Sequence, residues 1–204
     1  MVTPLVSLAP IVIYDTEFTA WPGSSARGWS GRHEHREIIQ IAAVKVQIVS
    51  SGVEILETFN ELVMPCINST LSEYIINLTG ISQQMLVDLA IDFPSCYRQF
   101  CSFIGNKQTK CLSWGDDRAV LLENCDINGC NHLWQDHESV NLRQLAQNKN
   151  LPGAGVVSGE IARTIGLDLQ GHVHNALHDV RSIALALEYW ITNHYLSSEE
   201  LLRL

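Results

Sequence analysis

The sequence predicts an α/β fold in which a mixed sheet, built mainly from the first third of the chain, carries helices around it. Three apolar runs with strand character come first, and helical periodicity dominates after about residue 80, interrupted by one short strand. The chain has 204 residues, of which 46% are apolar and 17% charged, as in a compact domain with a full-sized core. Without a repeat or a linker in the sequence, we predict a single domain over residues 1–204.

The first predicted strand is Pro10–Tyr14, and it runs directly into Asp15 and Glu17. Burying a carboxylate is costly unless something positive compensates it, so this run is either an exposed edge with incidental acids or part of a cation site. A Trp- and Gly-rich polar stretch from Ala20 to Arg36 follows. It is long for a loop inside a compact domain, and such loops are typically functional or mobile.

Two further strands are predicted at Glu37–Ile48 and Ile55–Pro65. The intervening letters VSSG are typical of a tight turn, so the two strands should form a hairpin. The sheet is therefore expected to begin with three largely antiparallel strands.

The second half reads mostly as helix. Ser82 is a plausible N-cap for one helix, and a second helix ends at Gly105. Lys110–Trp114 is predicted as a short strand before a helix that ends at Gly129, and the later VNLRQLAQN is either a helix or a strand–helix junction. The last long helix should begin near Asn175, because apolar residues then recur at steps of three and four.

Charge narrows the classes of partner. The formal net charge is −9, from 13 basic and 22 acidic residues. Proteins that hold duplex DNA through many phosphate contacts are normally basic, so an extended phosphate footprint is disfavoured. Short single strands, or phosphates bridged by a metal ion, stay compatible with this balance because a bound cation reverses the local charge.

The cysteines and the chain start bear on location. The first ten residues lack the basic segment of a signal peptide, and no stretch reaches the roughly 18 apolar residues of a membrane span, so we expect a soluble cytoplasmic protein with reduced thiols. Cys125, Cys130 and His132 resemble half of a zinc site. A second ligand pair is not apparent in the sequence, so buried or loop thiols are the favoured interpretation.

Acidic residues at element boundaries are the candidate chemistry. Asp15 and Glu17 stand two apart in a strand, so both carboxylates should project to one side and form a hard oxygen site suited to Mg²⁺ or Mn²⁺. In SWGDDRAVL an acid opens a helix, which is also ordinary helix capping. His174 precedes Asp179 by five residues, so both can face one cleft, although a solvated histidine and a surface aspartate would give the same spacing.

Taken together these segments resemble the DEDDh 3′–5′ exonucleases over nearly the whole chain. DTEFT is similar to the first motif of that family, SWGDDRAVL to the second and HNALHDV to the third, and EIIQIAAVKV and SEYIINLTGISQQML resemble the segments between them. Within the family, the sequence of these segments is most similar to the KapD-like and histone-mRNA-trimming branch. A bacterial subgroup of that branch has a similar Trp- and Gly-rich insertion after the first motif. The resemblance implies a ribonuclease H-like mixed central sheet, with three antiparallel strands first and parallel strands after them, flanked by helices.

The resemblance also implies a site. His174 would be the general base, a role that suits a group able to exchange a proton near neutral pH. Two Mg²⁺ or Mn²⁺ ions would activate water and stabilise charge on the phosphate. The residues that it places on these ions are Asp15, Glu17, Asp117 and Asp179.

Some assignments stay open at this point. The second-motif acid is usually followed four residues later by leucine, which favours Asp117 over Asp116. By resemblance, Thr16 and Phe18 would meet the 3′-terminal nucleotide, although Phe18 is equally well explained by core packing. His172 and His178 fit the third motif less well than His174 and are left out of the site.

The long loop and the substrate also allow alternatives. Trp21, Arg27, Trp29 and Arg32 suit single-stranded nucleic acid, but an insertion that folds on itself around its tryptophans explains them slightly better. The activity implied by the resemblance is removal of nucleoside 5′-monophosphates from the 3′ end of single-stranded RNA or DNA. The alternatives are a non-catalytic regulatory protein on the same fold and a phosphodiesterase for dinucleotides or short oligonucleotides. The oligomeric state is left open.

Overall fold

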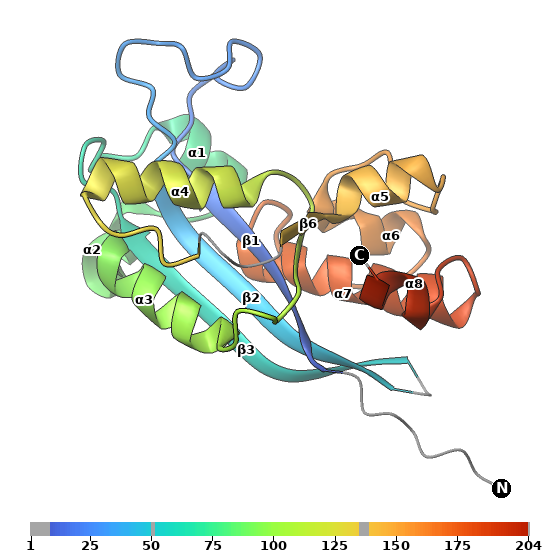
Figure 1. The fold of residues 1–204 in the computed structure, drawn as a ribbon. Coiled ribbons are helices and arrows are strands. Elements are labelled where there is room, and N and C mark those ends of the chain that lie inside the picture. Colours follow the sequence, from blue (N-terminus) through green and yellow to red (C-terminus); the bar gives the residue numbers. More distant parts are fainter. Residues whose placement is uncertain (1–8, 50–51, 135–138, 204) are drawn as a thin grey trace, which may run out of the picture.

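The computed structural model describes residues 9–49, 52–134 and 139–203, and its centre is a six-stranded sheet (Figure 1). The strand order is β4-β3-β2-β1-β5-β6. β1 pairs with β2 and β2 with β3 in antiparallel fashion, whereas β1–β5, β5–β6 and β3–β4 are parallel. This confirms the predicted mixed sheet. The strands are β1 Ile11–Phe18, β2 Ile38–Val49, β3 Gly52–Met64, β4 Ile91–Asp92, β5 Cys111–Ser113 and β6 Ser139–Asn141.

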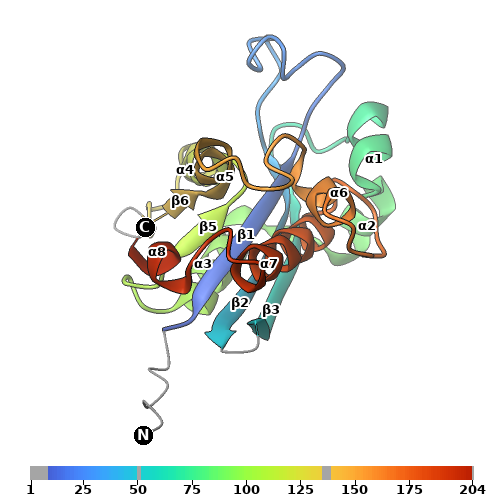
Figure 2. The ribbon, with the colours of Figure 1, turned by 90° about the vertical axis from the view of Figure 1, so that its right-hand side faces the viewer.

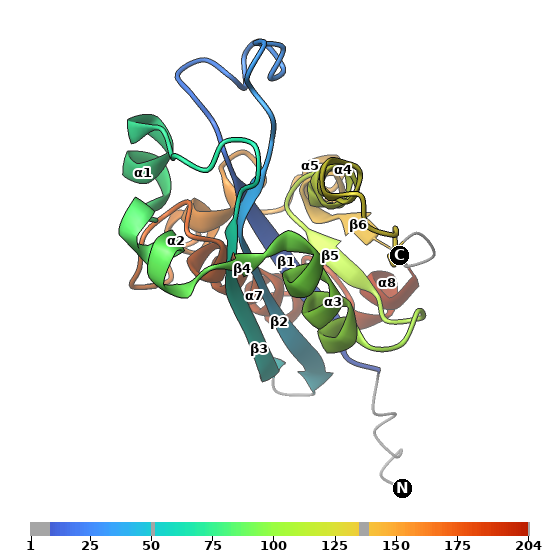
Figure 3. The same cartoon turned by 90° about the vertical axis from the view of Figure 1, so that its left-hand side faces the viewer.

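Helices cover both faces of the sheet. The long helix α7 lies across one face, and α3 and α4 lie on the other (Figures 2 and 3). The helices are α1 Glu73–Thr79, α2 Gln83–Leu89, α3 Phe93–Ile104, α4 Asp117–Asn128, α5 Leu142–Asn148, the 3₁₀ turn Ser158–Glu160, α6 Ile161–Thr164, α7 Ala176–Thr192 and α8 Ser198–Arg203.

The alternation of side chains along β1 divides the core in two. Ile11 and Ile13 pack with α7, whereas Val12 and Tyr14 point to the opposite face and pack with α3 and α4. Asp15 continues the face of Ile13. Both acids of the first motif therefore emerge on the side of the sheet that α7 covers.

The first strand is longer than predicted. Instead of ending at Tyr14, β1 passes through both acids to Phe18, because β2 pairs along its whole length as far as Phe18 opposite Ile38. On its other edge, β1 pairs with β5 only at Val12 and Ile13. The last part of β1 thus keeps one neighbour and exposes the other edge, which is where polar groups can be reached.

The predicted hairpin of β2 and β3 is present, with antiparallel pairing that reaches Val49 opposite Gly52. Its turn residues 50–51 lie outside the described residues, as do residues 1–8, on which the expectation about a signal peptide rested. The segment VNLRQLAQN is the strand–helix junction of the two alternatives, β6 followed by α5. The sequence reading did not predict α1, α6, α8 or the two-residue β4 as elements.

Among the residues that the structure describes, Cys125, Cys130 and His132 do not form a group of three converging metal ligands. Cys125 is buried and Cys130 half-buried, and burial raises the pKa of the Cys125 thiol to about 12. His132 Nε2 instead lies 2.7 Å from Asp126 Oδ1. Among the described residues, one group of three potential metal ligands occurs elsewhere, at Glu17, His174 and Asp179.

None of the described helices is long and apolar enough to cross a membrane.

Candidate active site

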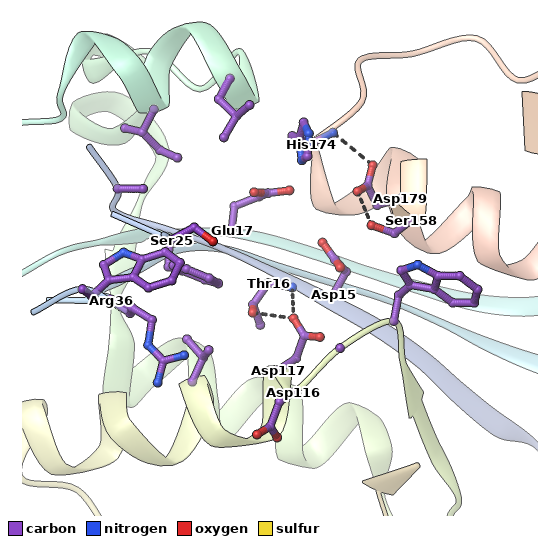
Figure 4. A pocket seen from close by; sticks show the side chains of 18 of the residues that line it. Asp15, Thr16, Glu17, Ser25, Arg36, Asp116, Asp117, Ser158, His174 and Asp179 are labelled. Carbon is purple, nitrogen blue, oxygen red and sulfur yellow. Dashed lines mark hydrogen bonds between the residues drawn. The ribbon is translucent and has the colours of Figure 1, made fainter. Parts of the chain in front are cut away.

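A cleft of about 340 Å³ opens where β1 runs past β5 (Figure 4). One side is acidic and the other is aromatic and apolar. β1, the loop after it, α1, the start of α4, the turn at Ser158 and the start of α7 all contribute to it. The acidic side holds Asp15, Glu17, Asp116, Asp117 and Asp179 with Ser158 and His174, and the opposite side holds Phe18, Trp21, Ser25, Trp29, Arg36, Tyr74, Ile75 and Leu78.

Asp15 and Glu17 are the two strand acids of the site. They are only 7% and 8% exposed, and Figure 4 shows both carboxylates pointing into the cleft. Burial raises the pKa of both well above the ordinary value, and the negative charges of Asp117 and Asp179 raise them further. Such mutual repulsion in a buried place is typical of a functional site rather than of a folded core.

Asp117 approaches β1 from the other side of the cleft. Its Oδ1 accepts hydrogen bonds from the Thr16 amide at 3.1 Å and the Thr16 hydroxyl at 2.7 Å. Burial raises the Asp117 pKa to about 6, although the two Thr16 bonds oppose the rise. Asp116 also lines the cleft, but it is exposed and its side chain caps nothing. The geometry thus favours Asp117 as the acid that faces β1.

A buried carboxamide fixes the helix that carries Asp117. Asn124 of α4 is only 1% exposed. Its side chain accepts a hydrogen bond from the Ile38 amide at 2.9 Å and donates one to the Arg36 carbonyl at 2.7 Å. These two bonds attach α4 to the start of β2. Since β2 pairs with β1, these bonds fix the position of Asp117 on α4 relative to Asp15 and Glu17 on β1.

Asp179 lies in the first turn of α7 and is held on both oxygens. Oδ1 accepts from the His174 amide at 3.2 Å, and Oδ2 accepts from the Ser158 hydroxyl at 2.6 Å. Gly159 allows this close approach, because a Cβ on it would lie 2.3 Å from Asp179 Oδ1. Burial raises the pKa of Asp179, while the Ser158 bond lowers it.

His174 stands in a strained turn before α7. Its φ is +67°, a left-handed conformation that costs a non-glycine residue about 1–3 kcal/mol and is found mainly where function requires it. Ligand atoms of Glu17, His174 and Asp179 all lie within 4.8 Å of one another. The turn therefore brings the imidazole to the carboxylates of two different elements.

The donor set fits a hard divalent cation. Four buried carboxylates repel one another, and among the described residues that line the cleft the basic side chains are His174 and Arg36, of which Arg36 is paired with Glu123 at 2.5 Å. Carboxylate oxygens with one imidazole suit Mg²⁺ or Mn²⁺. Asp15, Glu17, Asp117 and Asp179 are the residues that could hold such ions.

The loop between β1 and β2 folds on itself around Glu34. This carboxylate accepts from Arg27, the Ser24 hydroxyl and the Gly31 amide. Trp29 packs edge-on against Phe18 with 5.5 Å between ring centroids and donates from Nε1 to the Thr19 carbonyl at 3.2 Å. The loop is thus a built structure.

The same loop forms one wall of the cleft, so folding on itself and facing a ligand are compatible. Trp21, Trp29 and Arg36 line the cleft, and the Arg36 guanidinium lies 5.7 Å from the Trp29 ring centroid. Arg27 is occupied by Glu34, and Arg32 is exposed outside the lining. Phe18 is half-buried: it packs against the core, as one of its two interpretations expected, and it also lines the cleft.

The two histidines left out of the predicted site do not line the cleft. His172 is exposed beside Gly80 at the end of α1. His178 is buried, with Nε2 3.1 Å from the Gly159 carbonyl oxygen.

Sequence reasoning missed Ser158, which binds Asp179, and the α1 residues Tyr74, Ile75 and Leu78, which line the apolar side. A serine in an irregular segment carries no periodic or spacing signal. The α1 residues fall in the segment that resembled the family, but their side of the helix could be assigned only from the fold.

The family model RNase_T, described as Exonuclease, matches residues 12–187. The chain belongs to this exonuclease family. Rat 3′-5′ exoribonuclease 1 is 28% identical over 184 residues, which cover 85% of this chain and 50% of the relative, and human ERI1 exoribonuclease 2 is 26% identical over 86% of this chain and 27% of the relative. The chain thus spans half or less of the length of these curated exonucleases.

Solved structures agree with this membership. The nuclease domain of 3′hExo, a DEDDh family member bound to rAMP, superimposes with a TM-score of 0.75 at 25% identity, covering 94% of this chain and 95% of that domain. Cell-death related nuclease 4 superimposes with a TM-score of 0.72 at 21% identity, over 92% of this chain and 65% of that one, which shows the shared fold. The ribonuclease H-like DEDDh exonuclease fold implied by the sequence is therefore confirmed.

Proposed function

We propose that this chain is a divalent-metal-dependent 3′–5′ exonuclease that removes nucleoside 5′-monophosphates from single-stranded RNA or DNA. The observation that carries the proposal is the convergence of four buried acids and His174 on one side of a cleft whose other side is aromatic. RNA is the first substrate to test, because the relatives that match over most of this chain are exoribonucleases.

In this proposal two Mg²⁺ or Mn²⁺ ions, when bound, neutralise charge on the phosphodiester and lower the pKa of water. Asp15, Glu17 and Asp179 hold them from β1 and α7, and Asp117 adds a carboxylate from α4. Thr16 and Ser158 restrict the Asp117 and Asp179 carboxylates to one orientation each, through the bonds of 2.7 and 2.6 Å.

His174 takes the proton of the attacking water on a ring nitrogen. Its ring lies among the Glu17 and Asp179 carboxylates, so the base stands beside the groups that hold the ions. The hydrogen bond from the His174 amide to Asp179 fixes the distance between the base and that ligand. The water oxygen bonds to phosphorus as the P–O3′ bond breaks, the 3′ oxygen of the shortened strand takes a proton from solvent, and the proton on His174 leaves through the open cleft.

The aromatic side of the cleft receives the 3′-terminal nucleotide. Phe18 and Trp29 offer ring surface, and Tyr74 and Leu78 line the same side of the cleft. Stacking and apolar contact serve every base, so we expect low sequence preference. Both Thr16 donors point to Asp117, so a contact of Thr16 with substrate would use its remaining acceptor capacity.

The test uses 5′-labelled single-stranded RNA, the same sequence in DNA, and a dinucleotide, each with Mn²⁺ and with EDTA. We expect a ladder shortened from the 3′ end, release of 5′-monophosphates, and no cleavage in EDTA. Asp15→Asn and His174→Gln should each reduce the rate by at least about 100-fold. His172→Ala is the matched histidine control and should leave the rate unchanged.

The alternatives give different results. Cleavage of the dinucleotide alone would support a short-oligonucleotide phosphodiesterase, and metal binding without cleavage of any substrate would support a regulatory protein. Full activity in both Asp15→Asn and His174→Gln would contradict the proposed site. Loss of activity in Asp116→Asn but not in Asp117→Asn would reassign the second acid.

A further inference from the structure

Helix α7 begins against the sheet without a side-chain hydrogen bond from its own N-cap residue. Asn175 occupies the N-cap position, yet its side chain makes no capping hydrogen bond. The first amide of the helix, that of Ala176, instead donates to Gln40 Oε1 of β2 at 3.0 Å. A first-turn amide has no acceptor within its own helix, so this side chain from a strand satisfies it.

Gln40 is held from its other end as well. Its Nε2 donates to Asn60 Oδ1 of β3 at 2.8 Å, so the amide oxygen is left to face Ala176. The side chain is 2% exposed. A buried carboxamide with both ends bonded has one orientation, because turning it over would break both bonds.

The position of Gln40 connects the two parts of the candidate metal site. In the register of the sheet, Gln40 lies directly opposite Glu17. Ala176, which it binds, lies two residues after His174 and three before Asp179. The group of ligands within 4.8 Å, Glu17, His174 and Asp179, thus comes from two chain segments that Gln40 joins.

We propose that Gln40 is a positioning residue that registers the start of α7 against β1 and so sets the spacing of Glu17, His174 and Asp179 for the metal ions. This inference rests on the proposed metal-dependent function and adds a residue that contacts neither metal nor substrate. A sliding or tilting of α7 would move His174 and Asp179 together relative to Glu17. The bond from Ala176 to Gln40 opposes that movement between His174 and Asp179, where it ties the helix to the sheet.

Three variants separate the bond from the space that the side chain fills. Gln40→Met keeps the volume and removes the acceptor, and Gln40→Ala removes the tether while leaving room for water to accept from Ala176. Gln40→Glu keeps an oxygen toward Ala176. Asn60→Ala is the matched control, because it removes the other bond of Gln40 and leaves the bond to Ala176.

The readouts are the Kd for Mn²⁺, from electron paramagnetic resonance of the free ion, and hydrogen exchange of the Ala176 amide, with thermal unfolding as a check on folding. We expect Gln40→Met and Gln40→Ala to weaken Mn²⁺ binding about 10-fold or more, the range seen when groups that orient metal ligands are removed. Exchange at Ala176 should accelerate in both. Gln40→Glu should keep slow exchange at Ala176 and bind Mn²⁺ at least as well as Gln40→Ala, and Asn60→Ala should stay within about twofold of wild type.

The outcomes distinguish the two proposals. Wild-type protein that binds no Mn²⁺ would overturn the proposed function and the metal-spacing role with it. Wild-type binding with an unchanged Kd in folded Gln40→Ala would overturn the role of Gln40 alone. If Gln40→Met does not fold, Gln40→Ala decides, since water can replace the lost acceptor but cannot register the helix.

Discussion

Burial of the four acids makes the metal-free protein less stable as the pH rises above about 4. The pKa of Asp117 is about 6 in the folded chain, against an ordinary value of 3.8. Between these values the unfolded chain has released the proton while the folded chain retains it. The stabilisation from protonated Asp117 is therefore present in full below about pH 4 and lost as the pH passes about 6.

The size of the effect follows from the difference of about two units between the folded and ordinary pKa values of Asp117. At about 1.4 kcal/mol per unit, protonated Asp117 contributes about 3 kcal/mol to the free energy of unfolding in total. About 1.4 kcal/mol of this is lost between pH 5 and pH 8, because part of the loss has already occurred below pH 5. For a domain of this size that part corresponds to about 3–6 °C in Tm. The raised pKa values of Asp15, Glu17 and Asp179 act in the same direction.

The assay is thermal unfolding in EDTA from pH 5 to pH 8. This window avoids the acids with lowered pKa, such as Glu200 at about 2, whose contribution is lost only at lower pH. Asp117→Asn removes the titrating group, so the difference between wild type and this variant isolates it from the histidines, and Asp116→Asn is the exposed matched control. Mn²⁺ should raise Tm more at pH 8 than at pH 5, because it binds the ionised acids.

Two results would refute this reasoning. One is a wild-type Tm in EDTA that is flat or rises relative to Asp117→Asn as the pH goes from 5 to 7. The other is an Asp116→Asn profile that matches Asp117→Asn rather than wild type. The first would mean that the Asp117 carboxyl is already ionised at low pH in the folded chain, and the second that the pH dependence does not belong to Asp117 alone.

Two further predictions concern groups around the site. Ser158→Ala removes the hydroxyl that orients Asp179 and should weaken Mn²⁺ binding about 10-fold, measured by titration. Ser25→Ala is the control, because Ser25 also lines the cleft but makes no bond to an acid there, and it should leave the Mn²⁺ Kd unchanged. Equal Kd values in the two variants would contradict the orienting role. Glu34→Ala removes the acceptor that organises the loop after β1, so trypsin should cut after Arg27 severalfold faster with little change in global Tm, and an unchanged cutting rate would show that the loop is held by other contacts.

The sequence predicted the strand acids for a reason that holds within one element. A period of two places Asp15 and Glu17 on one side of a strand wherever that strand lies. Helical spacing, also a local property, placed Asp179 near the start of a helix. These statements need only local geometry, and the structure bears out the placement of the elements that carry them.

Convergence of the acids could not be predicted in the same way. Nothing in local periodicity brings Asp117 to Thr16 across 101 residues; the motif order of a family supplied that expectation, and the hydrogen bonds now supply its geometry. Gln40 and Ser158 were missed because each acts through one bond to a distant segment, and a glutamine in an apolar strand has no pattern of its own.

The extra length of β1 explains how the fold tolerates its acids. A strand that ended at Tyr14 would have placed Asp15 and Glu17 in a loop, free to turn toward water. Because β2 holds β1 as far as Phe18 while β5 leaves it after Ile13, the acids are fixed on a rigid strand but reachable from the open edge. On that edge the Thr16 amide donates a hydrogen bond to Asp117 Oδ1. Rigidity maintains the repulsion among the carboxylates in the metal-free protein, and this same repulsion is what a divalent cation relieves on binding.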